Sequence, residues 1–220
     1  SGPVASNPGL ATDNPANGGQ GTRDWFIKTS QRAPAALLEA YSPQSSALPG
    51  DKVAIHVSTS ANEWTLEAFR IGDYDGLGGV RIAQLGPFPG TKQGGPKQVG
   101  STRTMVAGWS ESASIDTTGW PPGFYLLHAI ANKKRTEIPL VVRSASADGA
   151  VAVICSAATW QAYNLWGGRS LYGNTALNLA ERSYAVSFDR PYNERGRGLL
   201  YSFEIPVARV AEESGVPLAW

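Results

Sequence analysis

The sequence contains a single cysteine, Cys155, among its 220 residues. One cysteine excludes an intrachain disulfide and a structural zinc site built from several cysteines. Charged residues make up only 17% of the chain and the formal net charge is +1, so no basic face for nucleic acid and no acidic tail is indicated. Apolar runs stay well below the roughly 20 residues needed to cross a bilayer. What remains is a globular chain long enough for two domains.

The N-terminal residues Ser1–Thr22 are rich in Gly, Ala, Asn, Pro and Ser and offer almost nothing to bury. This composition predicts an extended arm over residues 1–30, attached to a domain surface by the apolar segment Asp24–Ile27. The arm lacks the basic start and apolar centre of a signal peptide. A leader removed from a precursor would leave such an end, which favours a secreted or periplasmic protein and leaves a cytoplasmic one open.

Residues 31–145 predict an immunoglobulin-like antiparallel β-sandwich, because short strand patterns alternate with glycine- and proline-rich turns and helix signals are nearly absent. The predicted strands include Lys52–Ser58, Thr65–Ile71, Leu126–Ile130 and Ile138–Val142. The last two flank a polar turn, Asn132–Arg135, and should form a hairpin.

From residue 146 onward the pattern changes to strand and helix. The apolar run Val151–Cys155 predicts a strand buried on both faces of a parallel sheet. We further expect a short helix at Thr175–Leu179, a strand at Tyr184–Phe188, and an amphipathic helix at Leu199–Ser214 whose regular part begins near Pro206. This order predicts the first half of a flavodoxin- or glutamine-amidotransferase-like parallel α/β domain over residues 146–220.

Aromatic and amide side chains follow the two predicted strands of this region, at the strand ends where open α/β sheets bind ligands. We expect Gln161 and Asn164 to be catalytic, with Asn164 orienting the substrate carbonyl or a bound water. Tyr163 and Tyr192 each follow a strand end and are the expected metal ligands. A phenol ionises at neutral pH only beside a strong Lewis acid, so this hard oxygen set favours ferric iron.

Two alternatives compete with this interpretation. Aromatic residues spaced three apart on a helix, such as Trp160, Tyr163 and Trp166, can simply line a core face. Asp189 and Arg190 can form a buried salt-bridged turn that supports Tyr192, and support is the role we favour for Arg190.

Several motifs resemble the N,N-dimethylformamidase large-subunit-like family. They are WQAYN at 160–164, the pair Gly167–Gly168, SFDRPY at 187–192, and two upstream segments, Pro49–Gly79 and Gly119–Arg143. The resemblance extends from about Glu39 onward. It implies hydrolysis of an amide C–N bond at a mononuclear ferric ion held by two tyrosinates and one glutamate.

Within this resemblance, Tyr163 matches the tyrosine of WQAYN. Tyr192 is the best candidate for the second tyrosinate, with Tyr172, Tyr184 and Tyr201 as nearby alternatives. The glutamate is expected outside this chain, since Glu204 sits in a different motif.

The sheet predicted for residues 146–220 is incomplete, because open parallel sheets typically have about five strands or more. The last residues, Gly215–Trp220, look like the beginning of another strand. We therefore expect a second polypeptide that completes the α/β domain, in a heterodimer or higher oligomer, with a precursor cut after Trp220. Self-cleavage there would give an N-terminal-nucleophile amide hydrolase, which is one alternative function.

The other alternative is a non-catalytic binding module, in which the sandwich recognises carbohydrate or another ligand through Trp64, Trp109 and Trp120. Cys155 lacks the flanking glycines of a nucleophile elbow and a histidine that follows it, so we predict a buried structural thiol. His56 and His128 lie within strand patterns and are expected to be hydrogen-bonded sheet residues.

Overall fold

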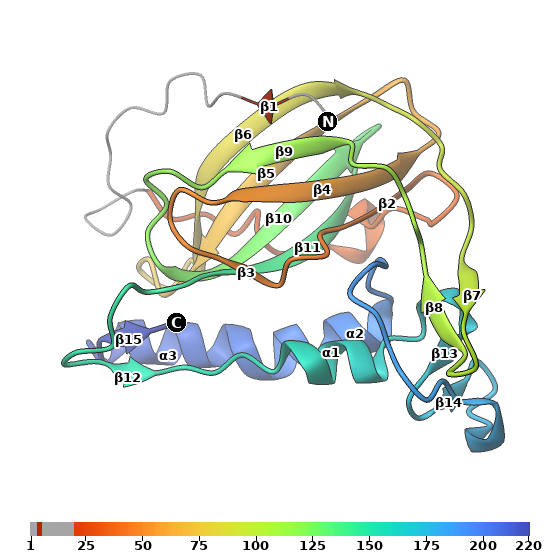
Figure 1. Ribbon diagram of the computed structural model, residues 1–220. Helices are drawn as coiled ribbons and strands as arrows, with labels where there is room; N and C mark the ends of the chain where they lie inside the picture. The colour runs from red at the N-terminus through yellow and green to blue at the C-terminus, as the bar shows by residue number, and fades with distance from the viewer. Residues whose placement is uncertain (1–3, 6–19) are drawn as a thin grey trace.

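The computed structural model describes residues 4–5 and 20–220 of the chain (Figure 1). Most of the predicted N-terminal arm therefore lies outside the described residues. The segment expected to attach it behaves as predicted, because Trp25 and Ile27 are both buried. A short 3-10 turn, η2 (Thr29–Gln31), follows.

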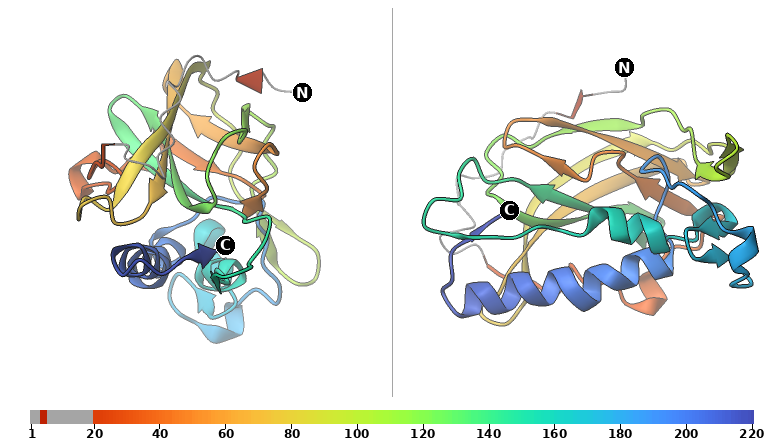
Figure 2. Two further views of the ribbon diagram at one scale, coloured as in Figure 1. Left: turned by 90° about the vertical axis from the view of Figure 1, so that its left-hand side faces the viewer. Right: turned by 60° about the horizontal axis from the view of Figure 1, so that its bottom comes forward.

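Two β-sheets, built mainly from residues 38–142, form one layered part of the molecule (Figures 1 and 2). The four-stranded sheet has the order β1 (Val4–Ala5), β9 (Ala113–Asp116), β4 (Lys52–Thr59), β2 (Leu38–Tyr41). The five-stranded sheet has the order β3 (Ser46–Ala47), β11 (Lys134–Val142), β10 (Gly123–Ala131), β5 (Glu63–Ile71), β6 (Gly79–Pro89). Neighbouring strands are antiparallel except for the pairs β1–β9 and β3–β11.

The main hydrophobic core lies between these sheets, because alternate residues of each strand point inward. Val53 and Ile55 of β4 belong to the same buried cluster as Leu127 of β10 and Leu140 of β11. The strands predicted from the sequence fall within β4, β5, β10 and β11. The predicted hairpin is confirmed as β10–β11, and its two turn residues, Asn132 and Lys133, have the positive φ values (48° and 63°) that a tight two-residue turn needs.

The C-terminal helices cover the other face of the five-stranded sheet (Figures 1 and 2). They are α1 (Ala157–Tyr163), α2 (Glu194–Leu199), the π turn η5 (Leu200–Glu204) and α3 (Ile205–Glu213). Phe69 of β5 and Phe124 of β10 pack in one buried cluster with Trp160 of α1 and Leu200. The five-stranded sheet is therefore buried on both faces.

The C-terminal third departs from the predicted α/β pattern. Parallel pairing is present, but it joins only two short strands, β12 (Val151–Ala152) and β15 (Leu218–Ala219). Val151 is 56% exposed and Ile154 is 90% exposed, so the prediction of a strand buried on both faces is wrong for this chain.

The second predicted strand, Tyr184–Phe188, is also wrong, because this segment forms bends. Its backbone instead joins the neighbouring hairpin β7 (Lys97–Val99) and β8 (Thr104–Val106), with the Tyr184 amide donating to Thr102 O at 2.8 Å. The predicted helix at Thr175–Leu179 is absent as well. That segment is an irregular loop that follows η3 (Trp166–Gly168), β13 (Arg169–Ser170) and β14 (Gly173–Asn174) and ends in η4 (Leu179–Glu181).

The last helix begins earlier than predicted, at Glu194 rather than Leu199. The Asn193 side chain caps it by accepting hydrogen bonds from the backbone amides of Arg195 (3.2 Å) and Gly196 (3.3 Å). The regular α-helical part, α3, begins at Ile205, next to Pro206 as predicted, and the π turn η5 joins it to α2, so Pro206 lies in the first turn of α3 where a residue without an N–H is accommodated. Within the described residues, none of the helices has the length and apolar character of a membrane span.

Candidate functional site

Asn164 joins the end of α1 to the segment Pro191–Asn193. Its Nδ2 donates to Gln161 Oε1 and to Pro191 O, both at 2.9 Å. Its Oδ1 accepts from the backbone amides of Trp166 (3.1 Å) and Asn193 (2.9 Å). The side chain is fully buried. Asn164 therefore positions these segments, and direct contact with a substrate would require one of these bonds to break.

Arg190 fixes the same region through hydrogen bonds to α1 and to the segment that follows it. Its guanidinium is fully buried and donates to Gln161 Oε1 (3.0 Å) and Gln161 O (2.8 Å), and to the backbone oxygens of Trp166 (3.3 Å) and Arg169 (3.2 Å). Burial lowers the pKa of Arg190 to about 10. These contacts agree with the supporting role that the sequence indicated for Arg190.

Asp189 has partners of its own on the β-sandwich, so the expected salt bridge between Asp189 and Arg190 is not formed. Its carboxylate accepts a hydrogen bond from the Tyr41 hydroxyl and another from the Gly108 amide at 3.2 Å. The SFDRPY segment is thus fixed to the sandwich by Asp189 and to α1 by Arg190.

Gln161 has a fixed side-chain orientation. Its Oε1 accepts from both Asn164 and Arg190, which identifies the remaining amide atom as Nε2. This Nε2 is buried and, among the described residues, has no hydrogen-bond partner. Gln161 therefore keeps one donor without a close acceptor, and its side chain faces the Tyr192 phenol, where it partly opposes the rise in pKa that burial causes.

Tyr192 is 7% exposed and packs in the cluster that contains Trp160 and Leu200. Burial raises the pKa of Tyr192, while the side chain of Gln161 and the charge of Arg190 oppose that rise only in part. The phenol is therefore neutral at physiological pH unless a Lewis acid takes up its charge.

Tyr163 has different surroundings. It lies two residues after Gln161, about 200° around the axis of α1, and is 39% exposed. Its ring stacks on Tyr172, with 4.3 Å between ring centroids and an interplanar angle of 25°. The neighbouring Tyr163 phenol raises the pKa of Tyr172. The structure thus brings Tyr163 together with Tyr172, whereas Tyr192 lies on the buried side of α1.

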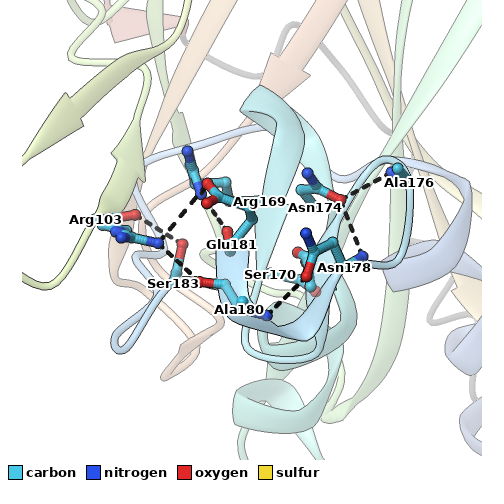
Figure 3. A network of polar contacts seen from close by, with 10 residues as sticks. Arg103, Arg169, Ser170, Asn174, Ala176, Asn178, Ala180, Glu181 and Ser183 are labelled. Carbon is cyan, nitrogen blue, oxygen red and sulfur yellow. Dashed lines mark hydrogen bonds and ion pairs between the residues drawn. The ribbon is translucent and has the colours of Figure 1, made fainter.

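The loop that carries Tyr172 is held at both ends by a polar network (Figure 3). Arg169 donates to the Glu181 carboxylate (2.9 Å) and to its backbone oxygen, and Arg103 pairs with the same carboxylate at 3.8 Å. Asn174 Oδ1 accepts from the amides of Ala176 (3.0 Å) and Asn178 (3.1 Å), which folds the loop on itself. Asn174 and Asn178 are residue types that favour a turn, although the sequence pattern predicts a short helix here.

Residues 65–220 match the family model described as N,N-dimethylformamidase beta subunit-like, C-terminal. The chain belongs to this family. The description names a beta subunit rather than the large subunit suggested by the motifs. The matched range begins in β5 and includes the helical layer, so it contains every candidate site residue. No match is found among curated proteins.

The tyrosines suit a ferric ion by their chemistry more than by their positions in this chain. Within residues 4–5 and 20–220, no group of three or more His, Cys, Asp or Glu side chains could hold a metal. Phenolate oxygens are hard donors that suit ferric iron, and Tyr163 is accessible with a second phenol, Tyr172, beside it. Tyr163 and Tyr192, the metal ligands expected from the sequence, contact different groups in this chain. Their positions therefore define no catalytic step through iron.

Cys155 has the surroundings of a structural thiol. Burial, and then the neighbouring Glu204 carboxylate, raise the pKa of Cys155 to about 12. A protonated thiol is a poor nucleophile. Glu204 itself accepts from the Ser156 amide (3.2 Å) and from Trp160 Nε1 (3.1 Å), so its carboxylate fixes the beginning of α1.

The two histidines differ. His56 is hydrogen-bonded as expected, with Nδ1 2.9 Å from Trp109 O, and it stacks on Tyr41. His128 is fully buried between Glu67 and Glu137 on the neighbouring strands, yet neither ring nitrogen has a hydrogen-bond partner among the described residues. Burial, and then the charges of nearby arginines, lower the pKa of His128 to about 3.

Trp64, Trp109 and Trp120 do not form a surface platform. They are 1%, 7% and 3% exposed, and Trp64 and Trp120 belong to the core between the sheets. The binding-module alternative loses the side chains on which it depended.

Proposed function

We propose that the protein is an iron-dependent hydrolase that cleaves an amide C–N bond other than a peptide bond. Membership of the dimethylformamidase-like family, over residues 65–220, is the observation that carries this proposal. The family suggests an amide hydrolase. The metal, the site residues and the substrate are the proposed parts.

We propose Tyr163 as one iron ligand. Tyr192, the second ligand expected from the sequence, lies on the buried side of α1, so it can share an ion with Tyr163 only if this region rearranges, and Tyr172 is the alternative second phenol. Accessibility of Tyr163 and the hard chemistry of phenolate oxygen support the first assignment. The position of Tyr172 against Tyr163 supports the alternative. A glutamate outside this chain completes the proposed set. When bound, ferric iron supplies a Lewis acid that polarises an amide carbonyl and acidifies water.

The protein's own contribution is to hold the tyrosines rigidly. Arg190 and Asn164 fix the segment before and after Tyr192 to the end of α1, which carries Tyr163. Gln161 keeps one buried N–H donor without a close acceptor, and we propose that this group orients a polar atom of the substrate while Asn164 acts by holding Gln161 in place. Such preorganised donors stabilise developing charge without reorganising during the reaction.

We propose that a second polypeptide completes the α/β region. The β12–β15 pair has only two strands, fewer than an ordinary sheet. Parallel sheets are also normally covered on both faces. Exposed apolar side chains lie in and just after β12 and along η5 and α3: Val151, Ile154, Phe203, Val207 and Val210. The beta subunit-like description is consistent with an enzyme of several subunits.

The test is hydrolysis of a small amide, N,N-dimethylformamide, by the native protein, followed as release of dimethylamine. We expect turnover that is lost when iron is removed with a chelator and restored when iron, but not zinc, is returned. Turnover that survives complete removal of iron would contradict the metal part of the proposal. No hydrolysis of any small amide by the iron-loaded native protein would contradict the reaction itself.

A further inference from the structure

A pocket of about 400 Å³ lies away from the candidate site residues, between the segment before η2, the turn after β5 and helix α3. Its walls include three cationic side chains and three apolar ones: Arg23, Lys28, Arg209, Trp25, Phe26 and Leu77. Its volume lies within the range of small-molecule sites. Since none of the Tyr163, Tyr172 or Tyr192 side chains lines it, this pocket does not depend on the proposed hydrolase site.

The charges around the pocket have one sign. Arg23, Lys28 and Arg209 are cationic, and no carboxylate is among the lining residues that the structure describes. Arg209 has spare donors: its Nη2 makes only a long bond of 3.4 Å to Gly76 O, and its buried Nε has no partner among the described residues. Three like charges around one cavity repel one another unless an anion lies between them. The pocket therefore favours a negatively charged group.

The apolar lining of the pocket is largely aromatic, and Phe26 supplies most of its exposed surface. Trp25 is 8% exposed, and its ring is fixed by a hydrogen bond from Nε1 to Leu77 O at 2.9 Å. Phe26 meets Trp25 edge to face, with centroids 5.9 Å apart, and half of its surface stays exposed. The Trp25 ring fits because Gly78 and Gly79 lack side chains, since a Cβ at either position would lie 2.8 Å from it.

We propose that this pocket binds a small organic carboxylate with a planar apolar body. The carboxylate lies beside Arg209, whose planar guanidinium can donate two parallel hydrogen bonds to it. The body lies against Trp25 and Phe26. An inorganic oxyanion would leave this aromatic wall uncovered, and a neutral molecule of the same shape would leave the three cations unpaired.

Calorimetric titration of the native protein with phenylacetate tests the proposal. Phenylacetone is the uncharged probe of nearly the same shape, without an amide bond that the proposed hydrolase could cleave, and acetate is the probe without an apolar body. We expect saturable binding of one phenylacetate per chain, with both other probes at least about tenfold weaker, which is about 1.4 kcal/mol. Arg209→Gln should weaken phenylacetate binding about tenfold, whereas Arg195→Gln, which changes an exposed arginine on α2, should stay within about twofold.

Arg23 is exposed, so Arg23→Gln serves as a second variant if Arg209→Gln does not fold, and it too should weaken binding. The proposal fails if phenylacetate shows no saturable binding up to about 10 mM, a limit close to the weakest specific affinities. It also fails if phenylacetone or acetate binds as tightly as phenylacetate. Unchanged binding in folded Arg209→Gln and Arg23→Gln proteins would overturn it as well.

Discussion

Arg190 binds Gln161 twice, through Nε to the side-chain oxygen at 3.0 Å and through Nη2 to the backbone oxygen at 2.8 Å. This pair of bonds connects the segment before Tyr192 to the helix that carries Tyr163. Both residues are almost completely buried, so the connection is shielded from water. The relative position of the proposed ligands therefore depends on an arginine that itself binds no metal.

Replacing Arg190 by lysine should destabilise the protein by about 3 kcal/mol. Lysine keeps the charge but has no planar fork, so several buried backbone oxygens lose their donor. Urea unfolding of Arg190→Lys measures the change in the free energy of unfolding. Arg195→Lys, on the exposed surface of α2, is the matched control and should change it by less than about 0.5 kcal/mol. A loss below about 1 kcal/mol in Arg190→Lys would contradict the structural role assigned to this side chain.

His128 should make the protein less stable as the pH falls from about 6.5 to 3. Its pKa is about 3 in the folded protein and about 6.5 in the unfolded chain, so the unfolded chain binds more protons in this window. Stability is thus retained above pH 6.5 and is lost on acidification by about 1.4 kcal/mol per pH unit at most. His128→Phe should remove this dependence. Between pH 7 and 5 its free energy of unfolding should fall by about 2 kcal/mol less than that of the wild type.

The measurement is urea unfolding at several pH values, with His56→Phe as the control for losing a histidine elsewhere. The neighbours of His128 stay the same in both proteins: Glu67, Glu137, Arg32 and Arg135. Parallel pH profiles for the wild type and His128→Phe would show that the buried imidazole is not the cause.

Replacing Cys155 by serine should leave amide turnover within a few-fold of the wild type. Burial and Glu204 keep the Cys155 thiol protonated, so it lacks the thiolate that nucleophilic catalysis requires. Steady-state turnover of Cys155→Ser at equal iron content is the measurement. A folded, iron-loaded variant without turnover would instead indicate a thiol mechanism.

The strands of the sandwich could be predicted because their apolar residues alternate and their turns carry glycine or asparagine. The segment Tyr184–Phe188 shows a similar alternation, but it has no neighbouring strand to pair with, and Tyr184 pairs with Thr102 instead. Strand formation requires a partner, which local sequence does not specify.

The early start of the last helix was not predicted because this segment contains glycines, which are poor helix formers. Gly196 lies in α2 because a Cβ there would be 3.0 Å from Trp160 O and 2.9 Å from the Tyr192 ring. Glycine permits α1 and α2 to approach closely, and this tertiary contact outweighs helix propensity. The same limit applies to the site, because only the folded loop shows that Tyr172, rather than Tyr192, lies against Tyr163.

The exposed apolar face should be covered in the native assembly. Phe203 and Val210 are 61% and 60% exposed on the helix, so Phe203→Ser with Val210→Ser should weaken association with the second polypeptide at least about tenfold while the chain stays folded. Sedimentation of the natively purified wild type and of the double variant measures this association. Glu213→Ser, an exposed change near the end of α3, is the control. A native protein that sediments as a single chain of this length, with full activity, would contradict the partner proposal.

Iron content and the visible absorption spectrum of the native protein show whether tyrosinate oxygens hold ferric iron in this protein. We predict stoichiometric iron with a visible tyrosinate-to-iron band, lost in Tyr163→Phe and retained in Tyr74→Phe, which removes a hydroxyl that accepts a hydrogen bond from Arg70 at 2.7 Å. The same spectrum decides the second ligand, because either Tyr192→Phe or Tyr172→Phe should weaken or shift the band. A colourless native protein, or a Tyr163→Phe protein with unchanged iron and an unchanged spectrum, would contradict this prediction.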